Sequence, residues 1–383
     1  MVYFKSDNII SSLGFSTKET FSSIFNGDIG IRQVEDSSIY HEPFPASMID
    51  LNRLNSEFEI LANKYSNTKE YTKLEKMLLL SIEEALRKSG VNIKSKRTGI
   101  IISTTKGNID LLETNNFPKD RVMLWKLGDV ISDFFDNPNK AIIISNACIS
   151  GVLAINTAAM YINSGRFDNM IVTGADIVSR FVVSGFMSFL SLSPTACKPF
   201  DKTRDGLSLG EAAATLILSN KRENNEHNIV HRGGASANDA NHISGPSRTG
   251  EGSFIAIDKA IKESGLNYNE IDHISAHGTA TPFNDEMESI AIHRHGMDKV
   301  PVNSIKGYLG HTLGAAGVVE TAILLEEMRR NTMIATEGYN EHGVTNDINV
   351  LSKNTSQNLN TCLKMASGFG GSNAAMIVSK SSK

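Results

Sequence analysis

Apolar and polar positions alternate along the chain with two periods, one typical of strands and one typical of helices. Short β-branched runs cover residues 98–104, 140–145, 170–173, 271–276 and 301–305, and each run predicts a buried strand. Apolar residues recur at helical spacing over residues 74–89, 151–163, 253–264 and 317–330. Strands and helices alternate through most of the chain, which predicts an α/β fold with substantial parallel sheet.

Residue types at the ends of these segments mark helix termini. Gly90 follows the segment 74–89, at a position where glycine commonly ends a helix. We expect Ser253 to cap the helix 253–264. We expect Asn284 to cap the helix that follows strand 271–276, with Asp285 and Glu286 in its first turn.

The second half of the sequence repeats the plan of the first. Gly151 and Gly317 each open a helix after a strand and a loop, and each is followed by valine. The chain has 383 residues, more than the ~250–300 residues at which single cores stop growing. We therefore expect two similar halves, residues 1–222 and 223–383, joined through the polar stretch 220–228.

Composition narrows the classes of function. Hydrophobic residues make up 40% of the chain and charged residues 21%, as in ordinary globular proteins. The net charge of -4 argues against a nucleic-acid-binding surface, and no apolar run approaches the ~18 residues of a membrane span. The N-terminus lacks the pattern of a signal peptide. Three cysteines do not suggest a disulfide framework, so we expect a reducing, cytoplasmic location.

Cys148 lies between the predicted strand 140–145 and the helix that begins near Gly151. A thiol at a helix start faces free backbone N–H groups and the positive end of the helix dipole. Both favour the thiolate, which is the nucleophilic form of cysteine. A small buried core cysteine is the alternative, because free cysteines are often buried. Position alone leaves both interpretations open.

Two histidines occupy positions where catalytic groups are common. His277 ends the predicted strand 271–276, and loops at the carboxyl ends of strands often carry such groups. His311 and Lys306 share the glycine-rich stretch 306–317, where the backbone can approach a ligand closely. This stretch is a candidate anion or carbonyl site. A strand-end histidine without a role and a flexible surface loop are the alternatives.

Two further motifs carry weaker signals. Phe369 lies among glycines in 368–373 (GFGGSN), which suggests a backbone N–H aimed at a ligand beside a movable aromatic wall, or a plain turn. His293 and His295 form a pair near a helix end, but the neighbouring residues add no convincing ligand set. We therefore expect no metal there.

Taken together, these segments resemble motifs of the β-ketoacyl-acyl carrier protein synthases, which are condensing enzymes of the thiolase superfamily. The matching segments are 146–151 (NACISG), 198–211 (with KPFD, RDG and GE), 277–285, 306–317 and 368–371. Their order and spacing agree over nearly the whole chain. The resemblance implies a five-layered α/β/α/β/α fold of two pseudo-equivalent halves, normally dimeric, as a homodimer or a heterodimer.

The resemblance also implies an acyltransferase reaction, the decarboxylative Claisen condensation. Cys148 would take an acyl group from an acyl carrier protein thioester. His277 and His311 would bind the carbonyl of a malonyl thioester, promote loss of carbon dioxide and stabilise the enolate. The backbone N–H groups of Cys148 and Phe369 would form the oxyanion hole. The product would be a 3-oxoacyl-acyl carrier protein, and no cofactor is expected.

Other residues would support this site. The resemblance suggests that Lys306 orients the site through Glu288 and nearby polar groups, with Asp285 and Asn373 in supporting positions.

The loop 103–108 (STTKGN) departs from the family pattern. The family usually has a glycine-rich loop there whose apolar residue gates the acyl pocket, and Lys106 replaces that residue; Phe369 would be a second gate residue. An ammonium buried against hydrocarbon is costly, so Lys106 argues against ordinary long-chain elongation. Alternatively, its stem packs on the pocket wall while its charge reaches solvent, which would leave the length preference unchanged. A specialised pathway with a polyene or polyketide-like product stays open.

Three alternative functions remain. The first is a non-catalytic partner that sets chain length in a ketosynthase heterodimer, and the intact Cys148, His277 and His311 argue against it. The second is a thiolase-like enzyme that joins acyl units without decarboxylation. It would need a second catalytic cysteine near the C-terminus, and the context of Cys362 (NTCLKM) does not fit that site. A cysteine hydrolase is a distant third.

Overall fold

A computed structural model describes residues 1–114, 116–222, 228–239, 245 and 247–381. The strands are β1 (Val2–Ser11), β2 (Ile31–Val34), β3 (Phe44–Ser47), β4 (Thr98–Ser103), β5 (Ile142–Ile144), β6 (Asn169–Asp176), β7 (Leu209–Gly210), β8 (Ala212–Ser219), β9 (Ile229–Asn238), β10 (His273–Ser275), β11 (Val302–Asn303), β12 (Thr332–Met333), β13 (Thr355–Ser356), β14 (Thr361–Gly368) and β15 (Ser372–Lys380). The helices are α1 (Thr17–Phe25), α2 (Leu51–Lys64), α3 (Lys73–Ser89), α4 (Leu124–Phe134), α5 (Ser150–Asn163), α6 (Arg180–Ser188), α7 (Glu251–Ser264), α8 (Pro282–Arg294), α9 (Lys306–Leu309) and α10 (Ala316–Arg330). Short 3₁₀ turns cover Ile109–Glu113, Lys119–Val122, Tyr268–Glu270 and Leu313–Ala315.

The large sheet contains ten strands in the order β11-β10-β14-β15-β9-β1-β8-β6-β4-β5. Each half of this sheet has the same plan, read outward from its centre. In the first half β6, β4 and β5 pair in parallel, while β8 runs antiparallel between β6 and β1. In the second half β14, β10 and β11 are parallel, while β15 runs antiparallel between β14 and β9. The two half-sheets meet where β1 pairs with β9.

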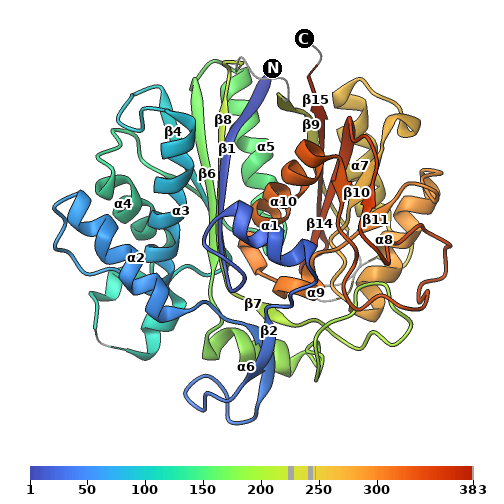
Figure 1. The fold of residues 1–383 in the computed structure, drawn as a ribbon, viewed down its shortest axis with the longest axis horizontal. Coiled ribbons are helices and arrows are strands. Elements are labelled where there is room, and N and C mark those ends of the chain that lie inside the picture. Colours follow the sequence, from blue (N-terminus) through green and yellow to red (C-terminus); the bar gives the residue numbers. More distant parts are fainter. Residues whose placement is uncertain (115, 223–227, 240–244, 246, 382–383) are drawn as a thin grey trace.

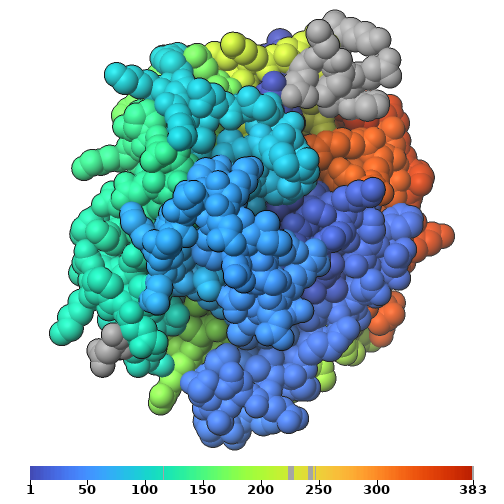
Figure 2. Space-filling model, turned by 60° about the vertical axis from the view of Figure 1, so that its left-hand side comes forward, coloured from blue at the N-terminus to red at the C-terminus, as the bar shows by residue number. Residues whose placement is uncertain are grey.

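Helices separate and cover the two half-sheets, which gives five layers (Figure 1). Helices α5 and α10 lie in the middle, where their apolar residues form one core with the inner faces of the strands. Helices α3 and α4 cover the outer face of the first half, and α7 and α8 cover that of the second. Figure 2 looks onto the first half, where the side chains of the N-terminal segments hide the sheet. The expected thiolase-like α/β/α/β/α fold of two pseudo-equivalent halves is therefore confirmed.

A pair of glycines lets the two central helices touch at their N-terminal ends. A Cβ atom on Gly151 would lie 2.7 Å from the backbone nitrogen of Val318, and one on Gly317 would lie 2.4 Å from that of Val152. Any larger residue at either position would push the helices apart. The repeated Gly-Val pair in the sequence thus marks the contact between α5 and α10, and this contact brings the loops before both helices together.

Most predicted elements are confirmed, and two predicted helix caps are wrong. Helix α3 follows Thr72, which forms a capping box with Glu75, and it ends at Gly90 in the left-handed conformation (φ 64°). Helix α7 begins after Gly250, so Ser253 lies inside its first turn. Helix α8 begins at Pro282, because the fixed φ of proline suits the first helical position. Asn284 therefore also lies inside the first turn.

The boundary between residues 222 and 223 stays a prediction. The predicted connection 220–228 falls largely on residues 223–227, which lie outside the described residues. Within the described part of the chain, no helix is long and apolar enough to cross a membrane.

Candidate active site

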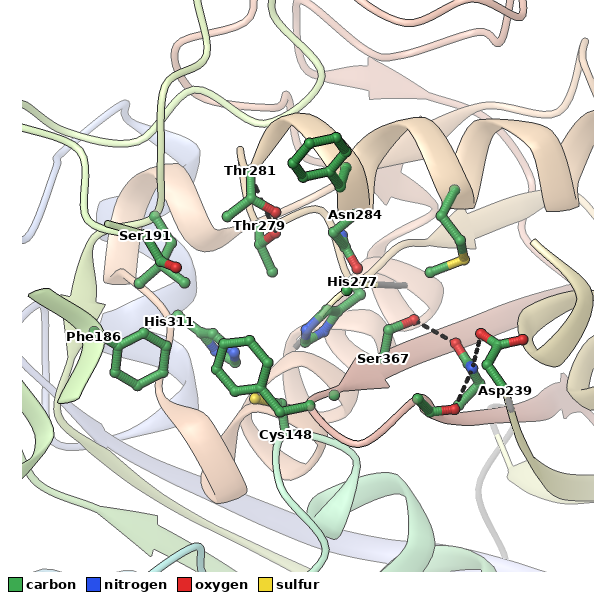
Figure 3. Close-up of a pocket in the computed structure, with 18 residues that line it drawn as sticks. Cys148, Phe186, Ser191, Asp239, His277, Thr279, Thr281, Asn284, His311 and Ser367 are labelled. Atoms are coloured by element: carbon green, nitrogen blue, oxygen red, sulfur yellow. Dashed lines mark hydrogen bonds between the residues drawn. The ribbon is translucent and has the colours of Figure 1, made fainter. Parts of the chain in front are cut away.

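Cys148 lies on a tight turn between β5 and α5. Ala147 just before it adopts a positive φ of 43°, which is unusual for a residue with a side chain. The Ser150 hydroxyl stabilises this turn, because it accepts a hydrogen bond from the Asn146 N–H (2.8 Å) and donates one to the Ala147 carbonyl (2.6 Å). The strand-turn-helix position predicted for Cys148 is confirmed. The turn directs the thiol into a cavity shared with residues of the other half (Figure 3).

The side chains of Cys148, His277 and His311 converge in this cavity (Figure 3). Their ligand-type atoms all lie within 4.8 Å of one another, and all three residues are buried. The two imidazole rings meet edge to face, with centroids 5.0 Å apart and an angle of 81° between their planes. His277 follows β10 and His311 follows α9, so two loops of the second half face a nucleophile from the first.

Hydrogen bonds indicate the same tautomer for both histidines. The Lys306 ammonium lies 3.3 Å from His277 Nδ1, and an ammonium can only donate. The Leu313 backbone N–H donates to His311 Nδ1 at 3.3 Å. Each Nδ1 is therefore an acceptor, so each Nε2 carries the proton. His311 Nε2 is buried and has no partner among the described residues, which leaves its N–H available for a ligand.

Burial sets the resting charge of the three converging groups. It holds the pKa values of His277 and His311 well below the usual value, and the Lys306 ammonium lowers them further. Both rings are therefore neutral at pH 7. Burial also raises the pKa of the Cys148 thiol to about 11, although Lys306 and Lys106 oppose the rise. The expected preference for the thiolate is wrong for the resting site, because loss of hydration outweighs the nearby cations.

Lys306 pairs with a carboxylate that the sequence interpretation did not identify. Its ammonium forms a buried ion pair with Glu320 on α10 and also donates to the His277 carbonyl. The predicted link between Lys306 and Glu288 is replaced by this pair. Glu288 instead accepts the backbone N–H groups of His277 and Gly278, each at 2.7 Å. Burial raises the pKa of Glu288 to about 7, and the neighbouring Asp285 contributes to the rise.

Asp285 and Asn373 support the walls of the cavity. Asp285 accepts the backbone N–H groups of Thr279 (3.0 Å) and Phe200 (2.7 Å), and thereby ties the loop after His277 to residue 200. Asn373 accepts a hydrogen bond from Ser367 (2.9 Å) and donates one to Asp239 (3.2 Å), as the dashed lines in Figure 3 show.

The loop that contains Phe369 approaches the backbone of Cys148. A Cβ atom on Gly368 would lie 3.0 Å from the Cys148 backbone nitrogen, so glycine is needed for this approach. The Phe369 ring lines the cavity, is 38% exposed and packs against Phe186 and Phe189, with centroids 5.7 and 5.4 Å away. The predicted aromatic wall is thus present beside the thiol.

Lys106 lies on the loop after β4, whereas Phe369 lies on the turn between β14 and β15. It is half-buried, its ammonium lies 3.2 Å from the Thr105 hydroxyl, and it is not among the residues that line the described cavity. Asp176 holds this loop beside the His311 loop, because its carboxylate accepts the N–H groups of Thr105 (2.8 Å) and Gly314 (2.7 Å). The gating role of Lys106 stays a prediction.

A cysteine and two histidines at this separation have the residue types of a zinc site. Two features disfavour a cation, however. Both Nε2 atoms carry protons, so neither offers a lone pair, and Lys306 places a positive charge directly behind His277. His293 and His295 are engaged elsewhere: His293 binds Asp298 (2.6 Å), and His295 binds the Ala291 carbonyl (2.8 Å).

Several residues of the site were not identified from sequence. Thr279 and Thr281 line the cavity and bind one another through their hydroxyls at 2.9 Å (Figure 3). Glu320 and Lys364 lie behind the histidines. Glu320 follows Gly317 by about one turn of α10, so it lies on the same helix face as the end of the glycine-rich motif. This spacing was the sequence signal that could have placed Glu320 near the site.

Comparisons with known proteins agree with this geometry. The family model described as "Beta-ketoacyl synthase, N-terminal domain" matches residues 9–224, and "Beta-ketoacyl synthase, C-terminal domain" matches residues 229–340. The 3-oxoacyl-[acyl-carrier-protein] synthase 2 of Vibrio cholerae is 28% identical, and that of Coxiella burnetii is 26% identical; the alignments cover 96–97% of this chain and 96% of each relative.

Solved structures have the same fold. A beta-ketoacyl synthase from Burkholderia phymatum superimposes with a TM-score of 0.88 at 24% identity, over 100% of this chain and 99% of that one. A ketosynthase in complex with its chain length factor from Xenorhabdus doucetiae gives a TM-score of 0.86 at 24% identity, over 99% and 98% of the two chains. Both family models and the full-length relatives lead to one conclusion: the chain belongs to the beta-ketoacyl synthase family.

Proposed function

We propose that this chain catalyses the decarboxylative condensation of an acyl primer with malonyl-acyl carrier protein. The first half-reaction moves the acyl group from a carrier-protein thioester to the Cys148 sulfur. The thiol proton of Cys148 ends on the departing carrier-protein thiol. In the second half-reaction malonyl thioester loses carbon dioxide, and the resulting enolate carbon attacks the acyl-cysteine. The products are 3-oxoacyl-acyl carrier protein, carbon dioxide and the regenerated Cys148 thiol after uptake of one proton.

One observation carries this proposal. Two neutral imidazoles have their Nδ1 atoms occupied as acceptors, so both Nε2–H groups are available to one carbonyl oxygen beside a buried thiol. A carbonyl that becomes an enolate needs donors where its negative charge develops. A cysteine hydrolase would instead need a histidine that accepts the thiol proton, and neither His277 nor His311 offers a free lone pair in this tautomer.

The backbone amides of Cys148 and Phe369 complete the proposed site as the oxyanion hole for acyl transfer. Support comes from the close approach of Gly368 to the Cys148 backbone. Glu288 and Asp285 hold the loop of His277 through backbone N–H groups, and Asn373 supports the wall of the cavity. These contacts would keep the donors fixed before substrate binds, which is the main source of electrostatic catalysis.

The proposed partners are an acyl carrier protein and a second ketosynthase-like subunit. Two similar structures are a ketosynthase with its chain length factor from Xenorhabdus doucetiae and the ishigamide ketosynthase/chain length factor. A homodimer or such a heterodimer is therefore proposed, with this chain as the catalytic subunit because it retains Cys148, His277 and His311. Another similar structure is described as a type II PKS acyl-carrier protein in complex with its ketosynthase, which supports a specialised, polyketide-like pathway. A cytoplasmic location is proposed because Cys148, Cys197 and Cys362 are all free thiols.

The test uses purified chain, acyl-carrier protein and malonyl-carrier protein, with mass spectrometry of both protein and carrier. We expect the acyl mass on the peptide that contains Cys148 and a 3-oxoacyl group on the carrier. Cys362→Ala is a matched control, since it removes another buried thiol outside the cavity. Acyl label on Cys197 or Cys362, or carbon dioxide release without a 3-oxoacyl product, would contradict the proposal.

A further inference from the structure

A second lysine is buried behind the two histidines. Lys364 lies on β14, and none of its surface is exposed. Its ammonium forms an ion pair with Glu320 (2.7 Å) and donates to the carbonyls of Ser275 (3.2 Å), Ala276 (3.1 Å) and Met365 (2.8 Å). Every polar contact of this nitrogen is to an acceptor, as an ammonium requires. Burial lowers the pKa of Lys364, and the Glu320 carboxylate opposes this fall.

Glu320 is shared by two ammonium groups. One carboxylate oxygen pairs with Lys306 and the other with Lys364. Lys306, Lys364 and Glu320 thus comprise two cations and one anion, and the buried Glu288 acts on both lysines from nearby. Buried charges are costly unless they are paired, so each ammonium here depends on these carboxyl groups. This cluster lies on the Nδ1 side of His277 and does not line the cavity.

The contacts of Lys364 also reach the histidine backbone. Ala276 directly precedes His277, and its carbonyl is held by Lys364 while the His277 carbonyl is held by Lys306. The two lysines therefore bind consecutive carbonyl groups of the strand-to-loop segment that presents His277. Through Glu320, each lysine also limits the movement of the other.

We propose that Lys364 is a positioning residue of the condensation site: with Glu320 it fixes Lys306 and the backbone segment that presents His277, and its positive charge acts on the two imidazoles from behind. This proposal rests on the proposed function. It assigns no contact between Lys364 and substrate. The alternative role is purely structural, in which Lys364 only neutralises Glu320 and ties β14 to β10.

The positioning role and the purely structural role of Lys364 can be distinguished through the charged groups around the imidazoles. The cations that act on the imidazoles are Lys306, Lys364 and Lys106. The acidic groups nearby are Glu320, Glu288 and Asp176, which act on these lysines or on Cys148. Lys364 lowers the pKa values of His277 and His311. Removal of this cation would raise both values, so imidazolium would form at higher pH. A protonated Nδ1 cannot accept the bonds from Lys306 and Leu313, and the donor geometry would be lost.

The experiment compares Lys364→Met with the parental chain. Carbon dioxide release from malonyl-carrier protein is measured from pH 5 to pH 9, together with the rate of Cys148 acylation by acyl-carrier protein. We expect kcat for decarboxylation to fall about 10-fold or more, because misplacement by ~1 Å can cost about 10²-fold. The acidic limb of the pH profile should move to higher pH, while Cys148 acylation stays unchanged.

Arg329→Met is the matched control. Arg329 lies on the same helix as Glu320 and forms an ion pair with the buried Asp7 (2.6 Å), but it does not line the cavity. It should lower the thermal midpoint without moving the pH profile. Lys364→Gln is a second variant that keeps an amide donor but no charge, and it should show the same shift of the acidic limb as Lys364→Met.

The outcomes separate this proposal from the proposed function. Suppose that the parental chain condenses, while Lys364→Met keeps the parental kcat and an unchanged acidic limb of the pH profile. This result overturns the positioning role alone. A parental chain that neither acylates Cys148 nor releases carbon dioxide overturns both. If Lys364→Met does not fold, Lys364→Gln decides by the same criteria. If Lys364→Gln also fails to fold, Lys364 serves the fold and the proposal is wrong.

Discussion

Replacement of His311 by alanine should slow decarboxylation far more than acyl transfer. The variant removes one of two Nε2–H donors that face the cavity, and this donor has no partner among the described residues. Removal of one such donor typically costs about 10²–10³ in rate, or about 2.7–4 kcal/mol of transition-state stabilisation. Acyl transfer should be nearly unaffected, because the backbone amides of Cys148 and Phe369 are proposed to stabilise that step.

The same substitution has a small structural cost that must be measured separately. The Leu313 N–H loses the His311 Nδ1 acceptor, and an unsatisfied buried donor costs about 1–3 kcal/mol of folding stability. His295→Ala is the matched control. His295 is also a buried histidine whose Nε2 lacks a partner among the described residues, but it packs on Phe254, outside the cavity.

The assay follows carbon dioxide release from malonyl-carrier protein and acylation of Cys148 in parallel, with thermal unfolding of each variant. We expect His311→Ala to lose about 10²–10³ in decarboxylation and His295→Ala to lose stability only. Decarboxylation by His311→Ala at the parental rate would refute the assignment of Nε2 as a donor to the enolate. An equal loss in both steps would show that the cavity had collapsed.

Three further predictions concern the nucleophile and the pocket. Since burial raises the pKa of Cys148 to about 11, its alkylation by iodoacetamide should accelerate throughout pH 7–10; a plateau below pH 8 would mean a thiolate at rest. Cys148→Gln should fold and release carbon dioxide from malonyl-carrier protein, because the amide mimics an acyl-cysteine carbonyl, while condensation stops; continued condensation would contradict the role of Cys148. If Lys106 limits the acyl pocket, Lys106→Ile should gain activity on longer saturated primers, whereas identical chain-length profiles would leave Lys106 without that role.

The main elements of the fold could be predicted because they depend on local patterns. The β-branched runs and the helical spacing are properties of neighbouring residues, and the repeated glycine before each central helix indicated two similar halves. Cys148, His277 and His311 could be singled out because each lies at the end of a strand or in a glycine-rich loop. The structure brings these three together where Gly151 and Gly317 allow α5 and α10 to touch.

Other features depend on distant contacts, which local patterns do not reveal. The choice of Glu320 over Glu288 as the partner of Lys306 is set by the packing of α10 beside β10, although both acids are buried. The protonated state of Cys148 depends on the burial of the whole site, while the sequence shows only the helix terminus. The start of α8 differs from the prediction for a simpler reason. Proline at the first helical position and asparagine at the cap are both common, and here the helix begins at Pro282.

The arrangement of charge explains why this site would favour decarboxylation over mere binding of malonyl groups. As the carbon–carbon bond breaks, negative charge leaves the carboxylate and arrives at the thioester oxygen. The two imidazoles line the same cavity with their centroids 5.0 Å apart, so both Nε2–H groups are proposed to stabilise the oxygen that gains charge rather than the carboxylate that loses it. Lys306 contacts His277 on its Nδ1 side, and its field adds to the donor strength of Nε2. Interactions that strengthen only as the transition state forms raise kcat, whereas equal binding of reactant and transition state does not.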